Sequence, residues 1–160
     1  MTTKTTNAAT SPAGAKDAIT LLEADHATVS GLFFDDEKVH FYAKKQALVA
    51  EICTELSVYA QIEEEIFYSA VKSALKDKLL FPDVTAEQAG VKELIAQLEG
   101  LEPDGEMYDV KVKVLFEYVK HHIKEEQNEM FPKFSSASLN LIELGVRMAT
   151  RKADLLVVRG

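Results

Sequence analysis

Two stretches of the sequence pair a ring-bearing side chain with a glutamate four residues later. In "LSVYAQIEEEIFYSA" Tyr59 precedes Glu63, and in "HHIKEEQNE" His122 precedes Glu126. A spacing of four places both side chains on one face of a helix, one turn apart. Carboxylates on a buried face are unfavourable unless they are paired or bound to a cation, and imidazole nitrogens are common ligands of the same cations. The two pairs therefore predict a metal site.

Two isolated polar residues, His26 and Gln88, lie on helical stripes that are otherwise apolar. A single histidine of this kind is more often a hydrogen-bonded core residue than a ligand. Gln88 also closes the sequence "TAEQ", in which Thr85 could cap a helix while Gln88 bonds back to its backbone amide. Tyr59 could likewise fill the core with its hydroxyl bonded to one of the two carboxylates. Because four helices agree, we predict one site with six candidate ligands: His26, Tyr59, Glu63, Gln88, His122 and Glu126.

The charged residues next to these candidates are predicted to face solvent. Glu64 and Glu65 turn away from the buried face in one stretch, and His121 and Glu125 turn away from it in the other. His40 lies in a predicted loop and is assigned to the surface.

Proline and glycine divide the chain into long helical pieces. They interrupt it mainly near residues 82, 100–105 and 132, and a further loop is predicted near residues 35–41. Between these points apolar residues recur at spacings of three and four, which is typical of amphipathic helices in a bundle. We therefore predict an all-α protein with an up-down four-helix bundle, whose third helix begins after "FPDVT". The predicted buried stripes are Ile19, Leu22, His26, Val29 and Phe33; Ile52, Leu56, Tyr59, Glu63, Ile66 and Ala70; Gln88, Val91, Ile95 and Leu98; and Val112, Leu115, Val119, His122 and Glu126.

An additional C-terminal helix is predicted over Leu139 to Val158. We expect it to dock outside the bundle or at a dimer surface, so the protein is predicted to be a monomer or homodimer. Its predicted buried face carries Ile142, Gly145, Ala149, Ala153 and Leu156.

Composition sets the class of protein. With 160 residues, 47% apolar and 28% charged, the chain is long enough for one globular domain. We predict a flexible N-terminal arm over residues 1–16, which lacks the apolar stretch of a secretory signal, and a domain over residues 17–160. No apolar run approaches the roughly 18 residues of a membrane span, and the single Cys53 is assigned to the core, so a cytoplasmic protein is expected. A net charge of -8 argues against a nucleic-acid partner.

Several longer motifs carry a family resemblance. The segments "LLEADHATVSGLF", "IEEEIFY", "VKELIAQLE", "YDVKVKVL" and "HHIKEEQNEMFPKF" occur in order between Asp17 and about Ala153. Together they resemble the bacterial hemerythrin-like proteins of the HHE cation-binding family. The resemblance implies a four-helix bundle that holds a non-haem di-iron centre through histidines and two carboxylates.

The resemblance also implies a ligand set, with two departures. It assigns His26 and His122 as histidine ligands and Glu63 and Glu126 as bridging carboxylates. Where the family usually reads H-A-Q-I-E-E-E and E-H-A-G, this chain has Tyr59 and Gln88 in place of the histidines. Tyr59 could bind iron as a phenolate once the metal lowers its pKa from about 10. Alternatively, both departures mark a site that has lost a metal.

Three functions remain open from the sequence. The first is a non-haem iron protein with a di-iron or mononuclear centre, with manganese as another possible metal, that reacts with oxygen or peroxide. The second is an iron-binding sensor or storage module, and the third is a structural bundle without metal. Turnover as an enzyme does not follow from the residues.

Overall fold

The computed structural model describes residues 17–39, 42–75, 80–103, 105–135 and 140–159. The predicted N-terminal arm and His40 lie outside these ranges. The described residues form long helices joined by short connections, which confirms the all-α prediction. Among the described helices, none is both long and apolar enough to cross a membrane.

The described residues form five long helical segments along the chain. Two of them are each built from an α-helix, a wider π-helical turn and a second, short α-helix. In order, the elements are α2 (Ala18–Lys38); α3 (Tyr42–Ile62), η1 (Glu63–Phe67) and α4 (Tyr68–Leu75); α5 (Leu80–Glu99); α6 (Glu106–Glu125), η2 (Glu126–Met130) and α7 (Phe131–Ser135); and α8 (Leu141–Arg159).

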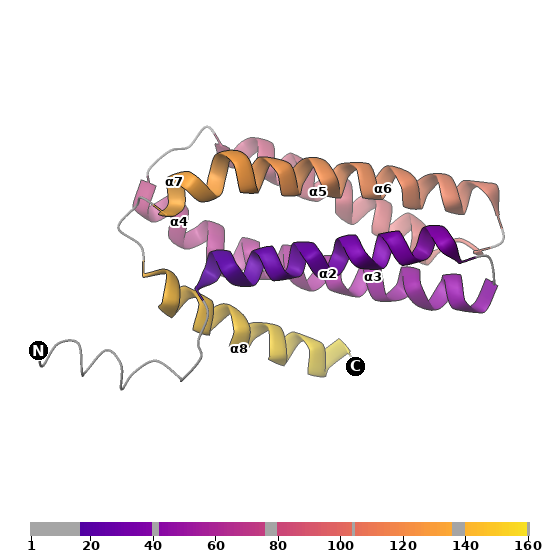
Figure 1. Ribbon diagram of the computed structural model, residues 1–160, viewed down its shortest axis with the longest axis horizontal. Coiled ribbons are helices and arrows are strands. Elements are labelled where there is room, and N and C mark those ends of the chain that lie inside the picture. Colours follow the sequence, from indigo (N-terminus) through magenta and orange to yellow (C-terminus); the bar gives the residue numbers. More distant parts are fainter. Residues whose placement is uncertain (1–16, 40–41, 76–79, 104, 136–139, 160) are drawn as a thin grey trace, which may run out of the picture.

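The first four segments form the bundle and the fifth lies against its outside. In Figure 1, α2 lies beside α3 and α5 lies beside α6, and α8 runs along the side of the bundle formed by α2 and α3. Helix α8 also contacts η1. The predicted four-helix bundle with an additional C-terminal helix is confirmed, and that helix docks outside the bundle.

Helix α2 follows its predicted stripe. Asp17 caps its start by accepting a hydrogen bond of 2.7 Å from the backbone N–H of Thr20. The buried side chains include Leu22, His26, Val29 and Phe33, all from the predicted stripe. The helix ends later than expected, at Lys38, because the stripe continues to a buried Asp36 in the last turn.

Helix α5 begins earlier than the sequence suggested. It starts at Leu80, so Thr85 lies inside the helix and does not cap it. The capping-box interpretation of Gln88 is therefore wrong. Pro82 did not prevent the earlier start, because it stands in the first turn, where its missing N–H would have no helical partner.

Of the face predicted for helix α8 only Gly145 is buried, and the other buried residues lie on a neighbouring stripe. Leu144, Met148 and Leu155 are buried, whereas Ile142 is 38% exposed and Leu156 is 36% exposed. Both sets follow helical spacing, so the periodicity fixed the helix but not which stripe faces α2 and α3.

The apolar core forms two clusters with the polar residues between them. One lies toward α8 and the other toward the opposite end of the bundle. Along α2, Leu22 belongs to the first cluster and Val29 to the second, and His26 lies between them. The fully buried members at the α8 end include Leu22, Phe67, Val71, Met130 and Phe134, and those at the other end include Phe33, Ile52 and Leu115.

The π-helical turns begin at the two glutamates of the predicted site. The backbone N–H of Tyr68 bonds to the carbonyl of Glu63, and that of Phe131 bonds to the carbonyl of Glu126, five residues back in each case. Each wide turn holds one more residue than an α-turn and shifts the buried stripe that follows. Val71 is consequently fully buried, whereas the predicted Ala70 is only partly buried.

Candidate metal centre

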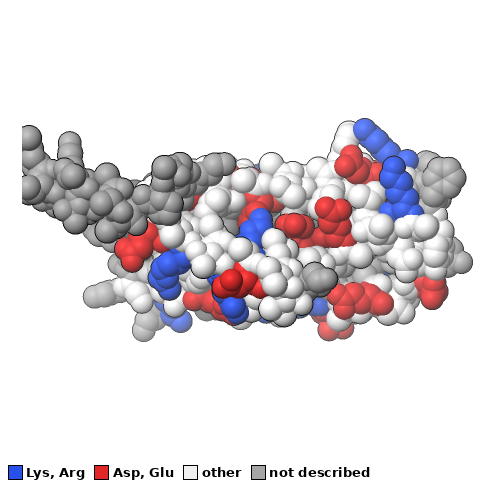
Figure 2. Space-filling view, turned by 90° about the horizontal axis from the view of Figure 1, so that it is seen from below, with Lys and Arg blue, Asp and Glu red and all other residues white. Residues whose placement is uncertain are grey.

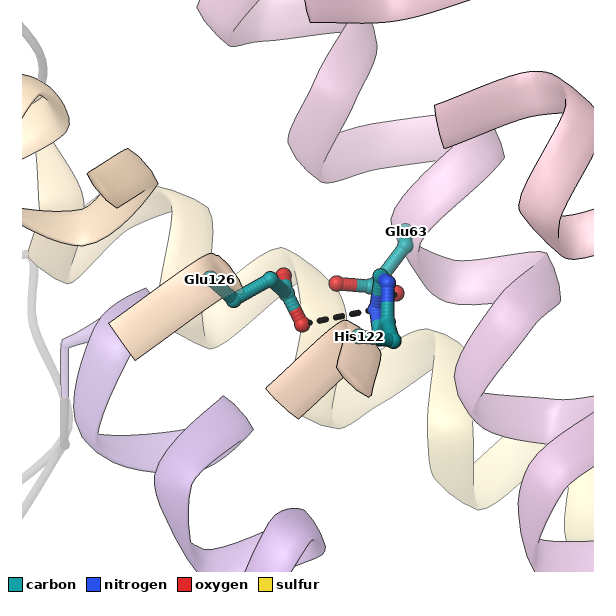
Figure 3. Close-up of side chains that lie close together, drawn as sticks. All are labelled: Glu63, His122 and Glu126. Atoms are coloured by element: carbon teal, nitrogen blue, oxygen red, sulfur yellow. Dashed lines mark hydrogen bonds and ion pairs between the residues drawn. The ribbon is translucent and has the colours of Figure 1, made fainter. Parts of the chain in front are cut away.

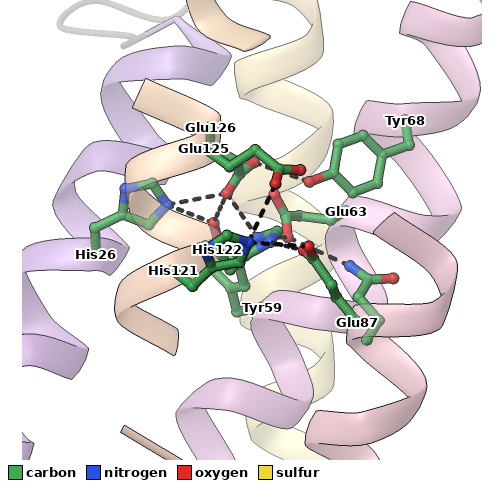
Figure 4. Close-up of polar contacts among 10 residues, drawn as sticks. His26, Tyr59, Glu63, Tyr68, Glu87, His121, His122, Glu125 and Glu126 are labelled. Carbon is green, nitrogen blue, oxygen red and sulfur yellow. Dashed lines mark hydrogen bonds and ion pairs between the residues drawn. The ribbon is translucent and has the colours of Figure 1, made fainter. Parts of the chain in front are cut away.

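The structure brings all six predicted site residues together inside the bundle. Figure 4 labels five of them, His26, Tyr59, Glu63, His122 and Glu126, which converge from different helices. The side chains of Glu63 and Glu126 are completely buried, with 0% exposure. The six come from α2 (His26), α3 (Tyr59), η1 (Glu63), α5 (Gln88), α6 (His122) and η2 (Glu126).

Glu126 contacts three of the other candidates through one oxygen. Its Oε1 lies 2.8 Å from His122 Nε2 and 3.1 Å from His26 Nε2. The hydroxyl of Tyr59 donates a hydrogen bond to the same oxygen. One potential ligand atom each from Glu63, His122 and Glu126 lies within 4.8 Å of the others. Figure 3 shows these three side chains close together.

Glu63 faces this group from η1 and is incompletely paired. Its Oε1 lies 3.2 Å from His122 Nε2 and accepts a hydrogen bond of 3.5 Å from Gln88 Nε2. Its Oε2 is buried and has no hydrogen-bond partner within the described residues. A buried carboxyl oxygen without a partner is rare, and a bound ion or a water is one way to supply the partner.

The hydroxyl of Tyr59 points toward His26 and Glu126. Its hydroxyl lies 2.5 Å from His26 Nε2 and donates to Glu126. Burial, together with the negative charges of Glu126 and Glu63, raises the pKa of Tyr59 well above its usual value. Without a cation the side chain is therefore a neutral phenol and acts as a hydrogen-bond donor.

The two carboxyls differ in their protonation. Burial and the nearby Glu126 charge raise the pKa of Glu63 well above its usual range. Burial alone would also raise the pKa of Glu126, but hydrogen bonds with Glu63, His122 and His26 lower it well below that range. Because two like charges in a low-dielectric core repel, the metal-free pair carries one ionised and one neutral carboxyl.

The other ring nitrogen of His122 faces Glu87. His122 Nδ1 lies 3.8 Å from Glu87 Oε2. Burial opposes the charge on His122, but Glu63 and the contacts with Glu126 and Glu87 raise its pKa well above its usual value. The metal-free core therefore holds an imidazolium beside an ionised carboxylate.

Sequence reasoning missed three residues at this site. Tyr68 donates a hydrogen bond of 3.0 Å to Glu126 Oε2, and Gln127 Nε2 lies 3.1 Å from His26 Nδ1. Glu87 contacts His122 as described. Tyr68 follows Glu63 by five residues across the π turn, so no spacing of three or four could have found it.

A small cavity lies beside the site. It measures about 40 Å³ and joins the polar residues to the apolar side chains of the second cluster. One water needs about 10–15 Å³ by a comparable measure, so the cavity admits a molecule of a few atoms. Its lining includes His26, Val29, Leu56, Tyr59, Glu63, Gln88, Val119 and His122.

Comparisons with known proteins agree with the fold. A crystal structure of a hemerythrin HHE cation binding domain-containing protein from Mycobacterium kansasii superposes with a TM-score of 0.75 and 24% identity, covering 88% of this chain and 87% of that one. A DNA nickase from Nostoc sp. is 25% identical over 111 residues, which make up 69% of this chain. The chain spans only 31% of the length of that relative. Residues 17–134 match the family described as Hemerythrin HHE cation binding domain, and the chain belongs to this family.

Proposed function

We propose that the protein is a non-haem iron protein with a di-iron, or failing that mononuclear, centre in the bundle core. The observation that carries the proposal is the pair of completely buried carboxylates, Glu63 and Glu126, beside two imidazoles. In the metal-free core only one of the two carboxyls is ionised, whereas a bound cation would allow both to be ionised. The unpartnered Glu63 Oε2 supplies a further ligand atom.

In this proposal each ligand has a stated role. Glu63 and Glu126 would hold the metal, and His26 and His122 would add imidazole nitrogens as further ligands. Tyr59 and Gln88 add oxygen atoms. A set rich in carboxylate, phenol and amide oxygen is hard, which favours ferric iron or manganese over soft metals.

The protonation of the core supports cation binding. The neutral Glu63 carboxyl and the His122 imidazolium hold protons that a cation would replace. Ligands must lose their protons to bind metal, so the affinity is expected to rise with pH. Gln127 would then hold the Nδ1–H of His26 through its amide oxygen, because the amide can present either end.

Bound iron would supply redox chemistry with oxygen or peroxide. The residues around it would shield the site from water and limit which molecules reach it. Two apolar clusters on either side of the site exclude bulk water, and the cavity of about 40 Å³ limits the substrate to a small molecule.

A sensor role is the second candidate, and one contact favours it. Arg151 of α8 pairs with Glu65 of η1, with Arg151 Nε 2.9 Å from Glu65 Oε2. Glu65 is two residues from Glu63, so a change at the centre could reach α8 through this turn. Steady-state consumption of peroxide separates the two roles, because an enzyme turns over many equivalents and a sensor reacts about once.

We propose no nucleic-acid partner. The net charge is -8, and the phosphate backbone requires clustered Lys and Arg. On the face drawn in Figure 2, basic side chains occur in small separate groups without a continuous basic area.

Metal analysis tests the proposed function. Protein purified from iron-supplemented cells should contain one to two iron ions per chain, and Glu63→Gln combined with Glu126→Gln should remove them. The matched control is Glu64→Gln, which changes the neighbouring exposed carboxylate and should keep the iron. Iron absent from the wild-type protein, or unchanged in the double variant, would contradict the proposal.

A further inference from the structure

A second group of metal-ligating side chains lies at the surface beside the core site. It consists of Glu87 from α5 and His121 and Glu125 from α6. His121 Nε2 lies 3.4 Å from Glu87 Oε1 and 3.4 Å from Glu125 Oε2. Figure 4 shows the three side chains next to the core ligands.

The two ion pairs of this surface cluster share one nitrogen atom. Both carboxylates approach the same nitrogen, His121 Nε2, which carries at most one proton. One carboxylate is therefore left without a hydrogen from this ring. A divalent cation placed among the three groups would contact all of them, because their ligand atoms lie within 4.8 Å of one another.

Glu87 joins the surface cluster to the core. Its Oε1 faces His121, while its Oε2 faces His122 Nδ1 at 3.8 Å. Glu87 Oε2 and His122 Nδ1 are both buried and lack hydrogen-bond partners within the described residues. Glu87 also lines the cavity that reaches Glu63, so one side chain touches solvent-facing and buried ligands.

We propose that Glu87, His121 and Glu125 form a second cation site that captures a divalent transition-metal ion from solvent and passes it to the core. One imidazole and two carboxylates suit Fe²⁺, Mn²⁺ and Zn²⁺. His121 is 65% exposed, so an ion from solvent can reach it. Capture does not depend on the proposed function of the core, whereas delivery rests on it.

Capture is tested by calorimetric titration of the chelator-treated, full-length protein with Zn²⁺. The wild type should bind one more ion than His121→Ala, or bind it at least tenfold more tightly. Glu125→Gln should show the same loss. Glu117→Gln is the matched control, since Glu117 is an exposed carboxylate of α6 paired with Lys120, and its isotherm should equal that of the wild type.

Circular dichroism would show that the variants fold, which is expected because His121 is mostly exposed. If His121→Ala and Glu125→Gln give the wild-type isotherm, the capture site does not exist. The same follows if Glu117→Gln lowers binding as much as they do, because general surface charge would then account for the effect.

Delivery is tested by anaerobic uptake of Fe²⁺. The chain has five tyrosines and no tryptophan, so tyrosine emission reports on the core through Tyr59 and Tyr68. His121→Ala should slow uptake several-fold at limiting Fe²⁺ and reach the same final iron content. An unchanged rate would overturn delivery.

A core variant separates this inference from the proposed function. Glu63→Gln combined with Glu126→Gln should abolish core uptake and keep the Zn²⁺ binding that depends on His121. If the wild-type core takes up no iron, the proposed function fails, but a loss of Zn²⁺ binding in His121→Ala still supports capture.

Discussion

Tyr68 and Tyr59 bond to opposite oxygens of one carboxylate. Tyr68 donates to Glu126 Oε2 at 3.0 Å, and Tyr59 donates to Glu126 Oε1. Tyr68 directly follows the π turn η1, and Tyr59 precedes η1 by about one turn of α3. Two phenols therefore fix the orientation of Glu126, and they do so before any cation binds.

Tyr68→Phe should weaken metal binding by about 10–100-fold, the usual effect of losing a group that orients a ligand. The metal-free protein should also lose about 1.5–3 kcal/mol of unfolding free energy, because the hydrogen bond goes to a charged group. Competition with a chelator and urea denaturation measure the two effects.

Tyr42→Phe is the control for that change, since Tyr42 donates to a carboxylate, Glu102, at the surface. It should leave metal affinity unchanged. Equal affinities for Tyr68→Phe and the wild type would show that Glu126 needs no support from this side.

Tyr59→Phe should remove the visible absorption of the ferric protein. We predict a charge-transfer band between the Tyr59 phenolate and ferric iron, because the hydroxyl already points at the ligand atoms of His26 and Glu126. Iron content measured alongside the spectrum separates loss of colour from loss of metal. The band should survive in Tyr68→Phe, and its survival in Tyr59→Phe at full iron content would leave Tyr59 as a core hydroxyl only.

Glu63→Gln should change how the stability of the metal-free protein depends on pH. The folded pKa of Glu63 lies above its ordinary value of 4.5, so from about pH 4.5 upward the folded state holds a proton that the unfolded state lacks. Stability therefore falls as pH rises through this window, by at most about 1.4 kcal/mol per pH unit. His122 adds the same sign above about pH 6.5, because its folded pKa is also raised.

Replacing Glu63 removes its part of that slope. Glu63→Gln should become steadily more stable relative to the wild type as pH rises from about 4.5, as measured by urea denaturation of metal-free samples. Glu64→Gln should follow the wild-type curve, since Glu64 faces solvent. Parallel curves for Glu63→Gln and the wild type would mean that Glu63 titrates normally in the folded protein.

Removal of metal should lower the melting temperature of the wild type. A cation that binds only the folded state adds about 2.7 kcal/mol when its free concentration is 100 times the dissociation constant. In chains of this size, each kcal/mol corresponds to about 2–4 °C. Calorimetric scans of iron-loaded and chelator-treated protein check this, and identical melting temperatures would favour a structural bundle without metal.

Reduced protein mixed with oxygen should be oxidised permanently. Oxygen carriage needs a ferrous pair that survives repeated binding. Tyr59 and Gln88 stand where the family usually has histidines, and as ligands they would offer oxygen in place of imidazole nitrogen, which favours ferric iron. Stopped-flow spectroscopy followed by purging with inert gas is the measurement. Recovery of the ferrous spectrum on purging would make the protein a reversible carrier.

Helical spacing was sufficient to find the bundle and all six residues that converge in its core. It succeeded because α2, α3, α5 and α6 each turn one continuous stripe inward, so residues four apart share a face. Spacing did not predict which face of a helix is buried where a neighbouring helix decides this. Leu144 and Ile142 both lie on apolar stripes of α8, and only the surface offered by α2 and α3 selects Leu144.

Spacing also failed where the helix geometry itself changes. Tyr68 and Val71 come after the π turn of η1, so their orientation relative to Glu63 departs from the α-helical period. The cap predicted at Thr85 was wrong for another reason. A local capping pattern carries no information about upstream residues that extend the helix.

The π turns also have an evolutionary consequence. One residue inserted into an α-helix produces such a turn, so removing one residue within η1 would restore the ordinary period and rotate everything after it by about 100°. That single deletion would carry Tyr68 away from Glu126 while both glutamates stayed in place. Proteins descended from this fold can therefore differ in which side chains hold the two carboxylates through the number of residues in each π turn alone.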